Sequence, residues 1–253
     1  YKNNYKFIQK YFPEIKELIN LKNHKIKLNY NKDRIKIEGV GKVLIEDNED
    51  KINYEITKNK NQFYFKNILE IKQNNFLINE LNYKKEKDKK VIIKIDGILK
   101  DNNNFFFKQI SLIENNNTIL VQDLNLDNKL MISDVRLIEL NYENSNNIHN
   151  QIYLKKDKKN YTIEGESFDA SKLINKMMRG NENNSSIFSN LNSTINLKIK
   201  KTYIDDISFI NNLSGIVEFN NNNINNLSLV SIFPNKKKLQ LRIHKNEKNE
   251  KIT

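Results

Sequence analysis

The chain has no cysteine, no tryptophan, two prolines and six glycines in 253 residues. Without cysteine, neither a disulfide framework nor a thiolate metal site can form, and the redox compartment is left open. No apolar run approaches the roughly 20 residues that a membrane-spanning helix needs, and the N-terminus has no signal-peptide pattern. Because the chain starts at Tyr1 rather than at Met, we expect a soluble portion of a longer protein.

The net charge is +12 and the pI is near 9.5, a balance that favours nucleic acid or an anionic surface as partner. Two features argue against that interpretation. Asn makes up about a fifth of the chain while Ala, Gly and Pro are scarce, which is the composition that an AT-rich genome produces. The lysines are also scattered along polar faces, whereas a nucleic-acid groove needs a basic stripe with aromatics. We therefore expect no nucleic-acid partner. A binder of an anionic surface would have a clustered basic face and salt-dependent affinity.

Apolar residues alternate with polar ones along most of the chain, which predicts a mainly β fold. The mean hydropathy of −0.73 and the 38% hydrophobic content are low for a compact core of this size, and they favour an elongated or one-sided architecture. Short polar segments such as NKD, EDNED and DNNN separate the runs. Strands joined by such turns predict an antiparallel meander.

Two short helices interrupt the strands. Pro13 suits a first helical position, and Ile15, Leu18 and Ile19 form an apolar stripe, which predicts a helix over 13–21. The second helix is predicted over 170–179, where Asp169 is the N-cap and Phe168 can pack on Leu173. Its apolar stripe and its end are formed by Leu173, Ile174, Met177, Met178, Arg179 and Gly180.

The pattern divides the chain into four parts. These are a helical lead-in over 1–24, an antiparallel β segment over 25–166, a short helix and loop over 167–191, and a further antiparallel β segment over 192–253. Gly39, Gly97 and Gly165 each end a unit of the form apolar-x-apolar-acid-Gly. We interpret the unit as a strand that ends in a tight turn or bulge with positive φ. A divergent structural repeat is the alternative.

The sequence offers little chemistry. His24, His149 and His244 are isolated, without a partner at metal-ligand spacing. The adjacent Asp205 and Asp206 fit a turn better than a shared acid and base. A crowded acidic loop at Glu46, Asp47, Glu49 and Asp50 fits a solvated hairpin tip or, alternatively, a weak calcium site. No nucleophile elbow, P-loop or dinucleotide fingerprint is present. We expect a protein that is not an enzyme and that uses no cofactor or metal.

The stretch YTIEGESFDASKLI resembles the alphaproteobacterial branch of the AsmA-like proteins, the envelope group that includes TamB and YhdP. In that branch a strand ending in Gly leads into a Ser-Phe-Asp-Ala segment and a short helix, as Gly165, Ser167, Phe168, Asp169 and Ala170 do here. The strand-rich segment from YIDDISF to KKKLQLRIH also resembles the strands that follow this helix in the family. The sequence departs from the family by its many Asn and Lys residues and by the absence of an N-terminal membrane anchor.

The resemblance implies a long, twisted antiparallel sheet that curls into an open apolar groove and conducts phospholipid across the periplasm. It implies acyl chains as partner, and an inner-membrane anchor outside this segment. The predicted helix would pack its stripe on the sheet or over one mouth of the groove. The late strands supply the predicted groove residues Ile195, Leu197, Ile199, Val217, Phe219, Leu227, Leu229, Leu239, Leu241 and Ile243. The alternative is a β-rich scaffold or adhesin-like module, which predicts a closed sandwich without a continuous apolar trough.

Overall fold

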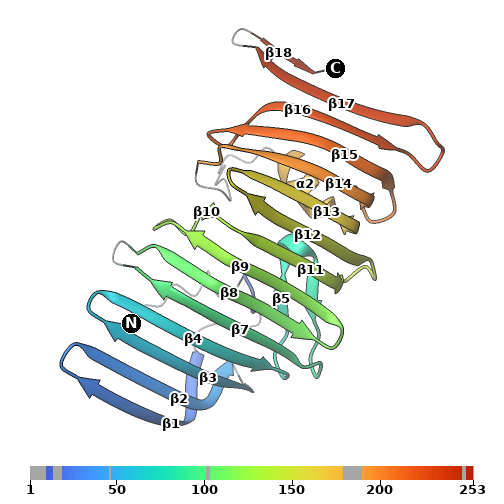
Figure 1. Ribbon diagram of the computed structural model, residues 1–253. Helices are drawn as coiled ribbons and strands as arrows, with labels where there is room; N and C mark the ends of the chain where they lie inside the picture. Colours follow the sequence, from blue (N-terminus) through green and yellow to red (C-terminus); the bar gives the residue numbers. More distant parts are fainter. Residues whose placement is uncertain are drawn as a thin grey trace.

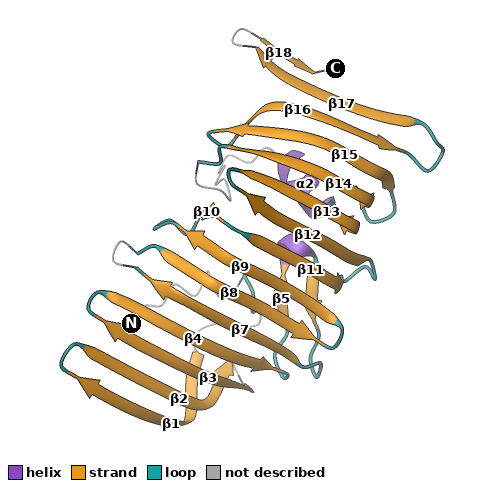
Figure 2. Ribbon diagram, viewed as in Figure 1, coloured by secondary structure: helices purple, strands orange, loops and turns teal. Residues whose placement is uncertain are grey.

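The computed structural model describes residues 10–13, 19–45, 47–100, 103–178, 190–246 and 249–252. Within these ranges, sixteen strands form one large sheet, and two more form a small separate sheet (Figures 1 and 2). The first strands of the large sheet are β1 (Ile19–Asn31), β2 (Arg34–Ile45), β3 (Asn48–Asn59), β4 (Gln62–Ile71), β7 (Val91–Leu99), β8 (Phe105–Glu114), β9 (Asn117–Leu126) and β10 (Ile132–Asp134). The later ones are β11 (Leu137–Glu143), β12 (His149–Asp157), β13 (Asn160–Asp169), β14 (Ser193–Tyr203), β15 (Phe209–Asn220), β16 (Asn223–Ile232), β17 (Lys238–Asn246) and β18 (Asn249–Ile252). The small sheet pairs β5 (Phe76–Ile78) with β6 (Tyr83–Lys85), and the helices are η1 (Asn79–Leu81) and α2 (Ser171–Met178).

The order of the strands in the large sheet follows the chain, so the predicted meander is confirmed for most of its length. One pair is different, because β13 and β14 run parallel. The prediction of an antiparallel sheet throughout is therefore wrong at this point, and the sheet is mixed. Parallel neighbours need a crossover connection of a dozen residues or more. Residues 170–192, which contain α2, supply that crossover.

The two predicted helices have different outcomes. Helix α2 spans Ser171–Met178, close to the predicted 170–179. Strand β1 begins at Ile19, so the helix predicted over 13–21 is wrong for its last residues, and residues 14–18 lie outside the described ranges. Strand β1 also starts inside the helical lead-in that was predicted over 1–24. Its alternation of apolar and polar residues begins at Ile19, before the predicted boundary at residue 25.

The repeated glycines lie inside strands and have no positive φ, so the turn interpretation of these positions is wrong. Gly97 and Gly165 adjoin register shifts, whereas Gly39 does not. These positions hold glycine because a side chain would have no room there. A Cβ on Gly39 would lie 2.2 Å from the ring of Tyr54, and a Cβ on Gly165 would lie 2.3 Å from the carbonyl oxygen of Gln151.

Asparagine takes the left-handed positions that glycine occupies in most proteins. Among the described residues, nine of the fifteen non-glycine residues with positive φ are Asn. Asn221 and Asn222, between β15 and β16, both have positive φ, as a type I′ hairpin turn requires. Asn tolerates this region better than other side chains do, which explains how so many tight turns form with so little Gly.

The core lies on one side of the sheet, under β5, η1, β6 and α2, which all lie behind the strands in Figure 1. We call this side the helix face and the other side the outer face. A row of paired residues runs across the helix face from strand to strand. It consists of Ile52, Leu69, Ile93, Leu112, Ile119, Leu140, Ile152, Gly165 and Ile199.

Aromatic residues join the small sheet to this row. Phe76 packs edge-on against Phe12, with ring centroids 5.3 Å apart, and Tyr83 packs edge-on against Tyr142 at 5.9 Å. Tyr83 and Tyr142 are fully buried. The large sheet itself is neither closed nor strongly curled, and its edge strands among the described residues are β1 and β18 (Figure 1).

Candidate functional site

The ten late-strand residues predicted to share one apolar surface do lie on one face, the helix face. Two rows cross this part of the sheet in register. The first consists of Tyr161, Ile195, Val217, Leu227 and Ile243, and the second of Ile163, Leu197, Gly215, Leu229 and Leu241. Ile199 pairs with Leu213, Phe219 with Ile224, and Leu239 with Ser231. We call the two rows together the late apolar face.

Burial along the late apolar face is uneven. Val217 and Leu227 are buried, Ile195, Leu197, Leu229 and Ile243 are half-buried, and Leu241 on β17 is 37% exposed. At the other end, Tyr161 is buried and its hydroxyl donates to Asp134 Oδ1 over 3.0 Å. Burial, together with this hydrogen bond, raises the pKa of Tyr161 to about 12. The surface therefore has a closed end at β13 and an open end at β17.

The SFDAS motif starts the crossover from β13 to β14. Asp169 is 3% exposed; its Oδ1 accepts from the backbone N–H of Ser171 over 3.0 Å and its Oδ2 accepts from Asn144 Nδ2 over 2.7 Å. The backbone N–H of Asp169 donates to Asn150 Oδ1 over 2.7 Å, and that of Ala170 donates to the carbonyl oxygen of Tyr203 over 2.9 Å. Asp169 therefore satisfies a backbone N–H at the start of the helix, as a cap does, but it lies one position before the N-cap, because Ala170 accepts the first intrahelical bond. The motif also fixes the start of the helix to two neighbouring strands.

The loop between β11 and β12 connects this motif to the small sheet. Asn144 lies in the loop and holds its shape, because its Oδ1 accepts from the backbone N–H groups of Asn146 and Ile148. Ser145 donates to the carbonyl oxygen of Asn82, next to η1. The sequence segment ENSNN predicts a turn here, but it gives no signal for the bonds to Asp169 and Asn82, since an Asn-rich turn resembles every other turn of the chain.

Helix α2, which follows the SFDAS motif, packs beside η1 on the helix face (Figure 2). Phe168 packs against the core row, and Leu173 and Ile174 are half-buried. The side chains of Met177 and Met178 lie outside the described residues. The helix was expected to pack on the sheet or to lie over one mouth of the groove. Its first turn does pack on the sheet.

Asp50 belongs to the acidic loop, but it does not lie at a solvated hairpin tip, because it is only 2% exposed. Its carboxylate accepts from the backbone N–H groups of Lys72, Gln73 and Asn74 and from Asn74 Nδ2. The buried Lys85 ammonium donates to the carbonyl oxygens of Lys72 and Asn74. Both interpretations of Asp50, hairpin tip and calcium ligand, are wrong, because its oxygens hold the turn after β4.

Glu49 of the same loop and His24, one of the three isolated histidines, also have structural partners. Glu49 receives the ammonium groups of Lys22 and Lys42, each at 2.5 Å. His24 Nε2 lies 3.0 Å from the carbonyl oxygen of Lys42, over Gly41. Asp205 Oδ1 accepts from the N–H groups of Ile207 and Ser208, which confirms the predicted turn and lowers the pKa of Asp205.

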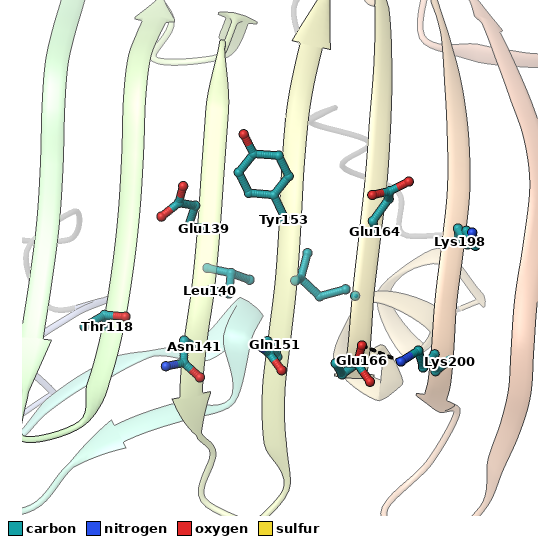
Figure 3. A pocket seen from close by; sticks show the side chains of 12 residues that line it. Thr118, Glu139, Leu140, Asn141, Gln151, Tyr153, Glu164, Glu166, Lys198 and Lys200 are labelled. Atoms are coloured by element: carbon teal, nitrogen blue, oxygen red, sulfur yellow. Dashed lines mark ion pairs between the residues drawn. The ribbon is translucent and has the colours of Figure 1, made fainter.

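The outer face has a shallow hollow of about 600 Å³ over β9, β11, β12, β13 and β14 (Figure 3). Glu139 and Tyr153 line one side, and Lys198 lies on the other. Lys200 and Glu166 form an ion pair at 2.7 Å, drawn as a dashed line in Figure 3. Opposite charges thus stand side by side on neighbouring strands. These charged side chains keep the outer face polar.

In the described part of the chain, no group of three or more His, Asp or Glu side chains is placed to hold a metal ion. Neither of the described helices has the length and apolarity that crossing a membrane requires. Comparison with family models, with curated proteins and with solved structures finds no match for this chain. The late apolar face is therefore the candidate functional surface on geometry alone.

Proposed function

We propose that the chain is a segment of a bridge-like envelope protein that conducts phospholipid along an apolar β-sheet surface between the inner and outer membranes. One observation carries the proposal: the two rows of the late apolar face continue in register over β13–β17, up to the exposed Leu241. Apolar side chains in a row toward an open end favour an elongated apolar ligand.

The physical advantage of such a surface follows from the hydrophobic effect. At about 0.8 kcal/mol per buried CH₂, an acyl chain of about 16 carbons loses roughly 13 kcal/mol of favourable burial on entering water. A continuous row of aliphatic side chains offsets part of that loss at every step. Conduction then needs no cofactor and no covalent chemistry in this segment, so we propose that it is not an enzyme.

The proposal includes a groove. The helix face would curl around the acyl chain, so that the rows line its inside and the polar outer face remains in water. Lys198 and Arg242 follow Leu197 and Leu241 in sequence and lie on the outer face. This separation of apolar and charged residues supports a sheet with one lipid side and one water side.

The proposed compartment is the periplasm, with an inner-membrane anchor elsewhere in the complete protein. Its support is the resemblance of residues 161–174 to the AsmA-like proteins. In this chain the same residues form the end of β13 and the start of the crossover. The resemblance therefore concerns how the sheet is built, and it is independent of the apolar rows.

A β-rich scaffold is the second candidate function, and the centre of the helix face favours it. There Ile71 and Val91 are fully buried beneath a layer of protein. This part of the face has no room for an acyl chain, so the covered centre would interrupt a lipid path along the whole sheet, and the lipid proposal concerns the late apolar face alone. In a scaffold, the late apolar face would instead pack against another protein layer.

The test is the phospholipid that purifies with the protein. Leu241→Asp places a carboxylate on the late apolar face, whereas Arg242→Asp places one on the outer face of the same strand. Both positions are exposed, so neither variant is expected to unfold the sheet. We expect phospholipid with the unmodified protein and with Arg242→Asp, and a severalfold loss with Leu241→Asp. Equal amounts with both variants, or none with the unmodified protein, would favour the scaffold.

A further inference from the structure

Strand β1 is an edge strand that lacks several of the features by which proteins protect a free edge. Among the described residues it pairs only with β2, so none of them pairs with the other side of its backbone. The strand has 13 residues and no proline. Its protective features are its lysines and the bulge at Asn23, where φ is 53° and the register with β2 shifts. From Lys25 to Asn31 the pairing with β2 is unbroken.

The regular part of β1 exposes large apolar side chains on the helix face. Ile26, Leu28 and Tyr30 are 61%, 63% and 74% exposed. Their β2 partners Gly39, Ile37 and Ile35 are buried or half-buried. The three β1 side chains are therefore exposed because no described strand lies beside β1 on its edge side. A strand docked there would cover all three side chains.

The other face of the same stretch is basic. Lys25 and Lys27 point to the outer face, opposite Val40 and Glu38 on β2. Lys22 is paired with Glu49, but Lys25 and Lys27 form no ion pair with any described residue. The edge therefore presents apolar residues on one face and two lysines on the other, of which Lys27 lies opposite Glu38 and helps to lower the pKa of that carboxyl.

We propose that residues 25–31 of β1 bind an extended segment of another protein, in which acidic and apolar residues alternate. Such a segment adds one strand to the sheet. Its backbone pairs with the free edge, its apolar residues cover Ile26, Leu28 and Tyr30, and its carboxylates lie beside Lys25 and Lys27. A strand rises about 3.3 Å per residue, so about seven residues of the partner are engaged.

Charge argues against a second copy of this chain as the partner. Two copies paired through β1 would bring Lys25 and Lys27 of each copy onto the same face. Pairing of β1 with the other end of the sheet would place them beside Lys238 and Arg242, which lie on the outer face of β17. With a net charge of +12, both arrangements are repulsive.

The experiment uses the whole chain and a fluorescein-labelled peptide of about seven residues in which Glu and Val alternate. Fluorescence anisotropy reports binding. Lys25→Glu/Lys27→Glu should weaken binding about tenfold or more, and should create binding of the matched Lys-Val peptide. Lys66→Glu/Lys94→Glu is the control, because it changes the net charge by the same amount at two exposed positions on β4 and β7, inside the sheet. The Glu-Val peptide with alternate backbone nitrogens methylated cannot pair with an edge, and should not bind.

Three results would overturn the proposal. The first is equal binding of the Glu-Val peptide to the unmodified protein and to the double variant. The second is equal binding of the methylated peptide, which would indicate charge attraction without strand pairing. The third is no binding of the Glu-Val peptide together with self-association of the protein in sedimentation, which would identify a second copy as the occupant. Far-ultraviolet circular dichroism confirms that each variant is folded.

Discussion

Replacing Asp169 tests whether the SFDAS motif holds the parallel crossover in place. The carboxylate is buried and accepts from the N–H of Ser171 and from Asn144 Nδ2. Asp169→Ala removes the acceptor for the Ser171 N–H, which costs about 1 kcal/mol, as the loss of a cap does. It also leaves a buried amide donor unsatisfied, which costs about 1–3 kcal/mol. The local free energy of opening should therefore fall by about 2–4 kcal/mol.

Asp169→Asn separates the two contributions. The Asn oxygen can still accept from Ser171, but its Nδ2 then faces Asn144 Nδ2, so that two donors meet. Asn144 cannot rotate to relieve this contact, because its own oxygen accepts from Asn146 and Ile148. We expect Asp169→Asn to cost about half as much as Asp169→Ala, mainly by losing the bond to Asn144.

Hydrogen exchange is the suitable assay, because an extended sheet can open locally without unfolding as a whole. The reporters are the N–H groups of Ala170 and Ile174, which donate to Tyr203 and Ala170. A loss of 2–4 kcal/mol corresponds to faster exchange by about 30-fold to 1,000-fold. Asp206→Ala is the control, since it removes an exposed bond to Asn146. If Asp169→Ala exchanges no faster than this control, the structural role assigned to the motif is wrong.

Three further variants and conditions test the sheet itself. Gly165→Val should destabilise the pairing of β12 with β13 by several kcal/mol, because a Cβ would lie 2.3 Å from the carbonyl oxygen of Gln151. The measurement is the midpoint of urea unfolding, and a midpoint equal to that of the unmodified protein would refute this prediction. Contacts with Lys22 and Lys42 lower the pKa of Glu49 from 4.5 to about 2, so the stabilisation that Glu49 gives β1 is complete above pH 4.5 and is lost as the pH falls toward 2. Hydrogen exchange in β1 should show this loss, and Glu49→Gln should remove the pH dependence. Burial and the hydrogen bond to Glu114 raise the pKa of Tyr83. Stability should therefore fall as the pH rises above about 10, the ordinary pKa of Tyr, and alkaline titration of Tyr83→Phe should show a smaller fall.

Alternation in the sequence predicted most of the strands because each strand has one face toward a core and one toward water. The pairing of Ile195 with Val217 and of Leu227 with Ile243 follows from that alternation together with short turns. Register is specified in this way, since a slip of one residue would turn every apolar side chain toward water. The helix at 171–178 was predictable because its cap and apolar stripe are local signals.

The features that the sequence did not reveal depend on contacts distant in the chain. Strands β5 and β6 have three residues each, too few for a period to emerge. The ammonium of Lys85 is buried only because the turn at Lys72 and Asn74 offers two carbonyl oxygens. The 170–192 connection is long enough for a parallel crossover. Its length alone was no signal, because the 72–90 connection is also long and joins the antiparallel pair β4 and β7.

The most direct test of lipid conduction is photo-crosslinking in cells, with a photoreactive amino acid at Leu241 or at Arg242. The two positions are adjacent on β17, both are exposed, and they lie on opposite faces of the sheet. The proposed function predicts that the probe at Leu241 captures phospholipid and that the probe at Arg242 does not. Equal capture at both positions, or capture of protein but no lipid at Leu241, would contradict it.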